Sequence, residues 1–424
     1  MRLRSTIWKS FVFCAVVLAL SGAQLHAQAT LLLEEPYSYD GTFAGTGHAA
    51  VYLSRVCADS PTILRRCHAG ETGVVISRYH RVAGLDWIAI PLLRYLYAVG
   101  SAEDIPLVAD PQLVNFLRNN YLNTIGVTDA ASYQLAGSAY DRTTFGFRIA
   151  TRPEQDDQLI ALLNSGQNNE SYKLLSRNCA DFAKQIINFY YPKAIHRSII
   201  GDLGVMTPKQ SAKSLVHFAK HHPEMQLTTF IIPQVPGLKR SKPVHGVIES
   251  VVLAKKYVTP VLLFHPLLVG TVEAAYWAGW RFNPGEGALI FDPNQLNVLE
   301  TPLSAADRRA YQKSIFILKR ENRELDLQGW RKFQASAEPQ LDLEGRPFLR
   351  MQVGERSFEV GICRGNAHRL SAPPEFTEQI LLTGLEQQLK PGKPSRISER
   401  QVESDWNLLQ SAVESREASL TDPR

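Results

Sequence analysis

The sequence predicts an α+β protein whose main domain is an antiparallel sheet packed on one helix. Three patterns carry this prediction: an alternating segment at residues 47–53, a β-branched segment at 73–80, and helical apolar spacing that begins at Cys179. With 45% hydrophobic residues, the chain is too apolar to be intrinsically disordered. We expect four parts, which are a signal peptide at 1–29, the main domain at 30–235, an apolar linker or helical segment at 236–300, and a small α+β domain at 301–424.

The N-terminal residues have the pattern of a secretory signal. Arg2, Arg4 and Lys9 precede an apolar run, and Ala27-Gln28-Ala29 offers a small-x-small cleavage site. The apolar run is short for a membrane span, which needs roughly 20 residues, and an uncleaved anchor is the alternative. We therefore expect an exported, periplasmic or envelope-associated protein. Cleavage removes three positive charges, so the net charge falls from +5 to about +2. A chain this close to neutral is not expected to bind nucleic acid.

Export places the cysteines in an oxidising compartment, where thiols tend to pair. Cys57 and Cys67 are close in sequence and flank a loop, which predicts a local disulfide. Cys179 and Cys363 either form a second bridge or are both free.

Two neighbouring strands are expected early in the chain. In the segment 47–53, His48, Ala50 and Tyr52 share one face, and the segment 73–80 fits its antiparallel partner. A third strand is expected at 143–149, after a helical insertion.

Start signals mark the helices. They are Asp110-Pro111, the stretch from Thr151 to Glu154, Thr207-Pro208 and Asn178, where Asn178 caps a helix whose first residue is Cys179. Asp181 completes a capping box, and Cys179 shares the apolar face of this helix.

The second half of the chain is less distinctive. Residues 258–280 are mostly uncharged, but Pro260, Pro266 and Glu273 favour a core helix or an interfacial segment over a transmembrane helix. A long helix at 305–333 and a hairpin at 348–353 and 357–363 define the C-terminal α+β domain.

A cysteine at the first position of a helix is placed for nucleophilic chemistry. Unpaired backbone N–H groups and the helix dipole favour the thiolate and can stabilise an oxyanion. A histidine is the base that suits near-neutral pH, and His48 lies in a strand that can face the helix. His221 and His222 have no nearby ligand at metal-binding spacing, so neither a metal nor another cofactor is expected.

The segments Gly47 to Leu53 and Asn178 to Ala183 resemble the circularly permuted papain-like proteins, which include NlpC-type cell-wall peptidases and relatives of lecithin–retinol acyltransferase. In that superfamily the histidine strand precedes the cysteine helix. The resemblance covers about residues 40–220 and implies Cys179 as nucleophile and His48 as base. It also implies a third polar residue on the next strand, for which Ser77, Arg78 and His80 are candidates and His80 is preferred.

The expected function is that of an exported thiol hydrolase that cleaves an amide or ester through an acyl-enzyme thioester, with acyl transfer left open. A cell-wall peptide or a lipid-type acyl compound is the expected substrate, with peripheral membrane contact through 258–280. The alternative is a non-catalytic envelope module that uses the same fold to bind.

Overall fold

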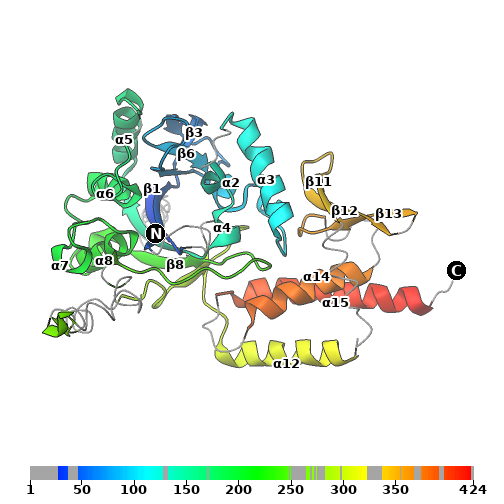
Figure 1. Cartoon of the computed structure of the whole chain (residues 1–424). Coiled ribbons are helices and arrows are strands. Elements are labelled where there is room, and N and C mark those ends of the chain that lie inside the picture. Colours follow the sequence, from blue (N-terminus) through cyan, green and yellow to red (C-terminus); the bar gives the residue numbers. More distant parts are fainter. Residues whose placement is uncertain are drawn as a thin grey trace, which may run out of the picture.

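A computed structural model gives the fold of the chain (Figure 1). It describes residues 27–36, 46–127, 132–169, 171–247, 249, 264–267, 270–271, 274, 282–296, 298–321, 337–353, 355–366, 374–390 and 396–421. Helices and three sheets are present, so the α+β class is confirmed.

The main sheet has eight strands in the order β10-β9-β8-β7-β1-β2-β5-β6. Neighbouring strands are antiparallel, except that β8 and β9 are parallel. The strands are β1 (Ala27–Glu34), β2 (His48–Leu53), β5 (Val74–Ser77), β6 (Ile88–Pro91), β7 (Thr144–Thr151), β8 (Thr228–Ile232), β9 (Leu289–Phe291) and β10 (Leu299–Glu300).

The three strands expected from the sequence are confirmed, with β2 and β5 as direct antiparallel neighbours. β5 ends at Ser77, three residues before the expected end, which leaves His80 beyond the sheet. The sequence pattern did not reveal the other five strands of the main sheet, which are β1, β6, β8, β9 and β10.

Helices cover both faces of the main sheet (Figure 1). One buried cluster joins Ala29, Leu31 and Leu33 of β1 to the helices on their side, α5 (Pro153–Ser165), α6 (Cys179–Tyr190) and α8 (Pro208–Ala219). The other joins Leu32 of β1 to α2 (Leu92–Tyr97), α3 (Pro111–Thr124) and α4 (Ser138–Asp141). The shorter helical elements are η2 (Ala102–Asp104), η3 (Ser132–Leu135), α7 (Ile199–Asp202) and η4 (Pro223–Met225).

The expected helix starts are confirmed by their capping hydrogen bonds. The side chain of Asp110 accepts from the backbone of Leu113 before α3, and Thr207 caps α8 through Gln210. The helix expected near Thr151 is α5, with proline at its first turn.

β1 is the central strand of the main sheet, paired with both β2 and β7. Ala29 lies opposite Leu53 on one side and Ile149 on the other, and it is fully buried. Residues 27–29, which the sequence assigned to the end of a signal peptide, therefore form the start of this strand. The rest of the expected signal peptide lies outside the described residues.

The loop between β2 and β5 contains a hairpin of β3 (Val56–Ser60) and β4 (Ile63–Arg66). Cys57 and Cys67 form the expected disulfide, with their Cα atoms 4.8 Å apart. The cross-link closes the base of this hairpin, which packs beside α5 and β6.

Replacing both Cys57 and Cys67 by serine is expected to lower the free energy of unfolding by about 2–3 kcal/mol, because the bridge closes a loop of about ten residues. Urea unfolding with and without a reductant checks this. The reductant should destabilise the native protein and leave the double variant unchanged. An equal effect of reductant on both proteins would contradict the assignment.

In the described residues, the C-terminal part forms a three-stranded sheet and three helices. They are β11 (Glu338–Leu341), β12 (Pro347–Val353), β13 (Arg356–Gly361), α12 (Ala305–Glu321), α14 (Pro374–Gln388) and α15 (Glu399–Thr421). β12 and β13 are the expected hairpin. The expected long helix is α12 as far as Glu321, and its remainder lies outside the described residues.

The linker expected at 236–300 contributes to the main sheet, because β9 and β10 belong to it. The C-terminal part also shares a core with the main domain, since Leu349, Val360 and Ile380 belong to the same buried cluster as α2 and α3. The parts are therefore joined more closely than the sequence suggested.

Among the described residues, no helix is both long and apolar enough to cross a membrane. The apolar segment 258–280 lies almost entirely outside the described residues. Two of its described side chains, Phe264 and Leu267, are 78% and 87% exposed.

Candidate active site

The first turn of α6 is fixed by a reciprocal capping box. Asn178 Oδ1 accepts from the backbone N–H of Asp181 at 3.0 Å, and Asp181 Oδ2 accepts from the backbone N–H of Asn178 at 3.3 Å. Asn178 Nδ2 also donates to the carbonyls of Leu174 and Met206. Cys179 is therefore held at the first position of α6 with the loops on either side anchored, as the sequence predicted.

Cys179 is a free, buried thiol packed against β2, and it is 7% exposed. Burial raises its pKa to about 11. Hydrogen bonds from the backbone N–H groups of Ala49, Ala180 and Cys179 itself oppose this, while the charge of Glu34 adds to it. Burial thus outweighs the helix N-terminus, and the thiol is protonated at neutral pH.

The contact with the Ala49 amide locates the sulfur. Ala49 directly follows His48 in β2, and α6 packs on this strand. The structure therefore brings Cys179 to the main chain at the same end of β2 as His48. In the described part of the chain, no hydrogen bond joins the Cys179 sulfur to the His48 ring.

His48 is held by Ser77, which comes from the neighbouring strand β5. Ser77 Oγ donates to the carbonyl of Ala49 at 2.8 Å and lies 2.9 Å from His48 Nε2. A serine hydroxyl has one hydrogen, so the contact with His48 requires Nε2 to be the donor. The imidazole is then the Nε2–H tautomer, and Nδ1 carries a free lone pair.

A buried polar network supports the other side of the imidazole. The ring of His48 stacks on Tyr79 with centroids 4.7 Å apart. The Tyr79 hydroxyl donates to that of Tyr95 at 3.4 Å, and Tyr95 donates to Glu34 at 2.7 Å. Glu34, itself 1% exposed, forms an ion pair with Arg142 at 3.1 Å.

This network also links the two candidate residues. Burial is the main cause that raises the pKa of Tyr79, followed by the charge of Glu34, and Cys179 contributes to the same shift. Cys179 and the tyrosine that stacks on His48 thus lie within electrostatic range of each other. The network was not predicted from the sequence, although the two adjacent acids Glu34 and Glu35, which follow the apolar residues 31–33, are a usable signal.

Ser77 contacts the imidazole, and the preferred third residue, His80, does not. His80 is exposed and lies against the ring of Tyr172, with centroids 5.2 Å apart. The other candidate, Arg78, is bound to Asp86 at 2.6 Å and stacks over the Phe182 ring. Of the three candidates, only Ser77 is placed to orient His48.

Burial lowers the pKa of His48 to about 3, with a smaller contribution from the charge of Arg142. The resting pair is therefore a neutral thiol and a neutral imidazole across the physiological pH range. The raised pKa of the thiol and the lowered pKa of the imidazole both disfavour a thiolate–imidazolium ion pair at rest, so we expect proton transfer to accompany attack on a substrate.

The lowered pKa of His48 predicts a dependence of stability on pH. Between pH 6.5 and 3, unfolded His48 binds a proton that the folded protein excludes, so stability is lost as pH falls. After allowance for its partial exposure, we expect this loss to be about 2 kcal/mol at pH 4. Urea unfolding at pH 7 and pH 4 measures this. Between these two pH values, the free energy of unfolding of His48→Gln should fall by about 2 kcal/mol less than that of the native protein. Equal acid sensitivity of the two proteins would show that His48 titrates normally.

Four exposed aliphatic side chains lie in two segments that Arg197 links to the first turn of α6, where it also binds Asp181. Leu174 and Leu175 precede the capping residue and are 46% and 63% exposed, and Ile199 and Leu203 at α7 are 80% and 67% exposed. Arg197 ties the two segments together, because it donates to the carbonyls of Ser176 and Gly204. We refer to these four aliphatic residues as the apolar rim.

Cys363, the other free cysteine, is fully buried after β13 and bridges to Pro106 through the backbone. The possible Cys179–Cys363 disulfide is therefore wrong. Within the described residues, the one group of side chains close enough to share a metal consists of Cys57, Cys67 and Glu71. Its two sulfurs are joined in the disulfide and are not available as thiolate ligands.

In comparisons with known proteins, the chain matches no family model, no curated protein and no solved structure.

Proposed function

We propose that the protein is a thiol hydrolase in which Cys179 is the nucleophile, His48 the general base and Ser77 the positioning residue. The observation that carries the proposal is the pair of Ser77 hydrogen bonds, which leaves His48 Nδ1 unprotonated next to the strand residue that contacts the Cys179 sulfur. The order of the histidine strand and the cysteine helix supports a permuted papain-like fold.

The reaction begins when Cys179 Sγ attacks a carbonyl carbon of an ester or amide. His48 Nδ1 takes the thiol proton as the C–S bond forms, and the carbonyl oxygen becomes an oxyanion. The backbone N–H groups of Ala49, Cys179 and Ala180, which act to lower the pKa of the thiol, are the donors available to stabilise negative charge there. The bond to the leaving group then breaks, and the leaving group receives the proton from His48.

The second half of the cycle frees the enzyme. Water attacks the thioester carbonyl while His48 accepts a proton from the water. Collapse releases a carboxylic acid, and His48 returns the proton to the sulfur. An alcohol or amine in place of water would give acyl transfer by the same steps.

The apolar rim favours a lipid-type acyl substrate over a cell-wall peptide. Exposed leucine and isoleucine side chains beside a buried nucleophile suit acyl chains better than a polar peptide. The exposed Lys173 adjoins the rim and matches an anionic head group, whereas the neighbouring Arg177 is paired with Asp86 at 3.2 Å.

The test is covalent trapping. The protein is incubated with p-nitrophenyl octanoate and then analysed by intact-mass and peptide mass spectrometry. The expected product is an octanoyl adduct on Cys179 that hydroxylamine removes, as it removes thioesters. If the protein hydrolyses the ester steadily and no adduct forms on Cys179, the assignment of Cys179 as the nucleophile is refuted.

The substrate class gives a separate prediction. The native protein should bind vesicles that contain phosphatidylglycerol, and Leu175→Ser with Leu203→Ser should weaken binding about tenfold, because each leucine contributes apolar burial. Vesicle sedimentation measures this. Leu343→Ser, which alters a fully exposed leucine of the C-terminal part, is the matched control. Unchanged binding in the double variant would favour a peptide substrate.

A second candidate function is a non-catalytic binding module. It is favoured by the burial of Cys179 and by its raised pKa, which are also the properties of a small core residue. The trapping experiment separates the two, since a binding module forms no acyl adduct.

A further inference from the structure

Helix α12 has one side buried in the C-terminal part and the other side exposed. Ile315 is 5% exposed and belongs to a buried cluster with Leu385 of α14 and Leu409 of α15. The ring of Tyr311 lies against that of Trp406 of α15, with centroids 5.6 Å apart. In Figure 1, α12 runs along the edge of the molecule, with α14 and α15 on its inner side. The described part of the chain leaves the outer side of α12 exposed.

The outer side of α12 combines apolar and basic side chains. At about 3.6 residues per turn, residues 305, 306, 309, 313, 316, 317 and 320 fall within roughly one third of the helix circumference. All of them are exposed, and none is acidic. They comprise two alanines, Phe316 (67% exposed), Ile317 (43% exposed), Arg309, Lys313 and Arg320. We refer to these residues as the outer face of α12.

The three cations of the outer face are not neutralised within the described structure. Arg309, Lys313 and Arg320 have no ion-pair partner among the described residues. Their neighbour Lys319, which lies outside the outer face, binds Glu386 of α14 at 2.9 Å. Like charges on one side of a helix repel each other, so an anionic partner would stabilise the outer face.

Acidic side chains near α12 are found on its other sides. Burial raises the pKa of Tyr311 on the inner side, and the charges of Glu403 and Glu399 of α15 add to this shift. Glu414 lines the groove between α12 and α15 beside Ile317, at the border of the outer face. The centre of the outer face therefore carries positive charge that the neighbouring helices do not cancel.

These features match the surface of an anionic lipid bilayer. Long basic side chains can keep their charges among the head groups while their stems cover apolar surface. Phe316 and Ile317 can enter the boundary between head groups and acyl chains, as in helices that lie in the plane of a membrane. Each cation near a negatively charged leaflet strengthens binding about fivefold, so three cations favour an anionic over a neutral surface by about 10²-fold.

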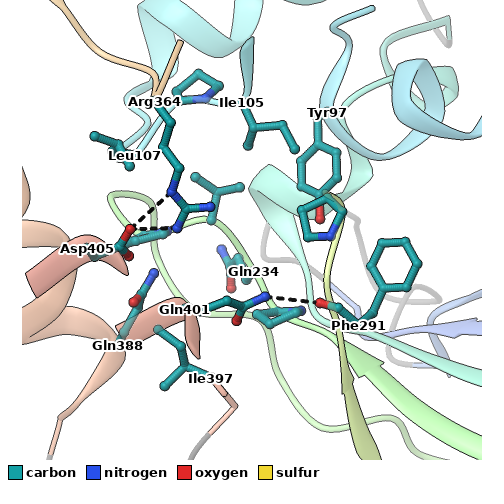
Figure 2. A pocket seen from close by; sticks show the side chains of 15 residues that line it. Tyr97, Ile105, Leu107, Gln234, Phe291, Arg364, Gln388, Ile397, Gln401 and Asp405 are labelled. Carbon is teal, nitrogen blue, oxygen red and sulfur yellow. Dashed lines mark hydrogen bonds and ion pairs between the residues drawn. The ribbon is translucent and has the colours of Figure 1, made fainter. Parts of the chain in front are cut away.

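Polar contacts join the helices that hold α12 to the main domain. Gln401 Nε2 of α15 donates to the carbonyl of Phe291 in β9 at 3.3 Å (Figure 2). The preceding residue, Arg400, binds Asp292 at 2.7 Å. A surface that binds α12 would therefore also set the orientation of the main domain.

We propose that the outer face of α12 docks on an anionic lipid bilayer, with its two large apolar side chains at the head-group boundary and its three cations on lipid phosphates. This surface belongs to the C-terminal part and shares no residue with the apolar rim. The proposal does not depend on the activity of Cys179.

Vesicle sedimentation of the full chain tests the proposal. The probes are vesicles of phosphatidylcholine alone and vesicles of an equal mixture of phosphatidylcholine and phosphatidylglycerol. The native protein should bind the mixed vesicles at least tenfold more tightly, and added salt should weaken this binding because it screens the cations. Absence of binding to the mixed vesicles, or equal binding to both kinds, would overturn the proposal.

Two variants locate the contact. Phe316→Ser, and Lys313→Gln combined with Arg320→Gln, should each weaken binding to the mixed vesicles at least tenfold. Lys193→Gln combined with Lys220→Gln is the matched control for charge, because it removes two exposed cations from the main domain. The control should change binding less than twofold. Native-like binding by both α12 variants would contradict docking through this helix.

The rim variant, Leu175→Ser with Leu203→Ser, separates this proposal from the proposed function. Weaker binding in the α12 variants alone supports docking through α12 and favours a peptide substrate at the rim. Weaker binding in all of them supports both contacts, and weaker binding in the rim variant alone overturns docking through α12. Hydrolysis of p-nitrophenyl octanoate should be unchanged in the α12 variants, because this ester reaches the candidate active site from solution.

Discussion

Replacing Cys179 by alanine is expected to abolish the octanoyl adduct and to lower hydrolysis of p-nitrophenyl octanoate by at least about 10³-fold. In the proposed mechanism the sulfur is the atom to which the acyl group is bound, and no other group can take its place. Steady-state release of p-nitrophenol and intact-mass spectrometry give the two measurements. The loss should appear in kcat, because the thioester forms after the substrate is bound.

The chain provides a matched control for this variant. Cys363→Ala removes the other free, buried cysteine, and it should leave hydrolysis within about twofold of the native rate. Both variants lose one buried sulfur, so both test the effect of a small core cavity. A similar fall in rate for the two variants would mean that stability, and not a nucleophile, accounts for the loss at Cys179.

The raised pKa of Cys179 also predicts how the thiol reacts with an alkylating reagent, because such a reagent reacts with the thiolate. Iodoacetamide should label Cys179 slowly at pH 6, and the rate should keep rising toward the thiol pKa of about 11. Rapid labelling at pH 6 would reveal a resting thiolate and contradict the neutral pair.

Local signals in the sequence account for the elements of the candidate site that the structure confirms, the start of α6 and strand β2. The capping box between Asn178 and Asp181 involves neighbours in the chain, and it fixes the start of α6 and the position of Cys179. The alternation around His48 likewise identifies β2. These features need no knowledge of the rest of the fold.

Long-range pairing accounts for what the sequence did not reveal. Ser77 was one of three candidates within four residues, and only the point where β5 ends decides among them. Because the strand stops at Ser77, this side chain stays on the sheet beside His48, whereas His80 lies beyond it. Likewise, β1 overlaps the residues that looked like a signal cleavage site, and its place between β2 and β7 depends on partners far along the chain.

His48→Ala is expected to lower acylation of Cys179 by about 10³-fold at pH 7, within the usual range for loss of a general base. The thiol must then lose its proton to water, which is unfavourable for a group with a pKa of about 11. The deficit should shrink as the pH rises toward that value, because hydroxide forms the thiolate directly. The rate of octanoyl adduct formation between pH 6 and 10 provides the measurement.

Two further variants assign the positioning role. In Ser77→Ala the imidazole loses the partner that fixes its tautomer, and acylation should fall about tenfold at pH 7, as is typical when an orienting partner is lost. His80→Ala should change the rate less than about twofold, since its exposed ring contacts only Tyr172 in the described structure. Added imidazole should partly restore His48→Ala and leave Ser77→Ala unchanged, because only the first variant lacks a base. If His80→Ala lowered acylation more than Ser77→Ala, the imidazole of His48 would have to turn from Ser77 toward His80 during the reaction.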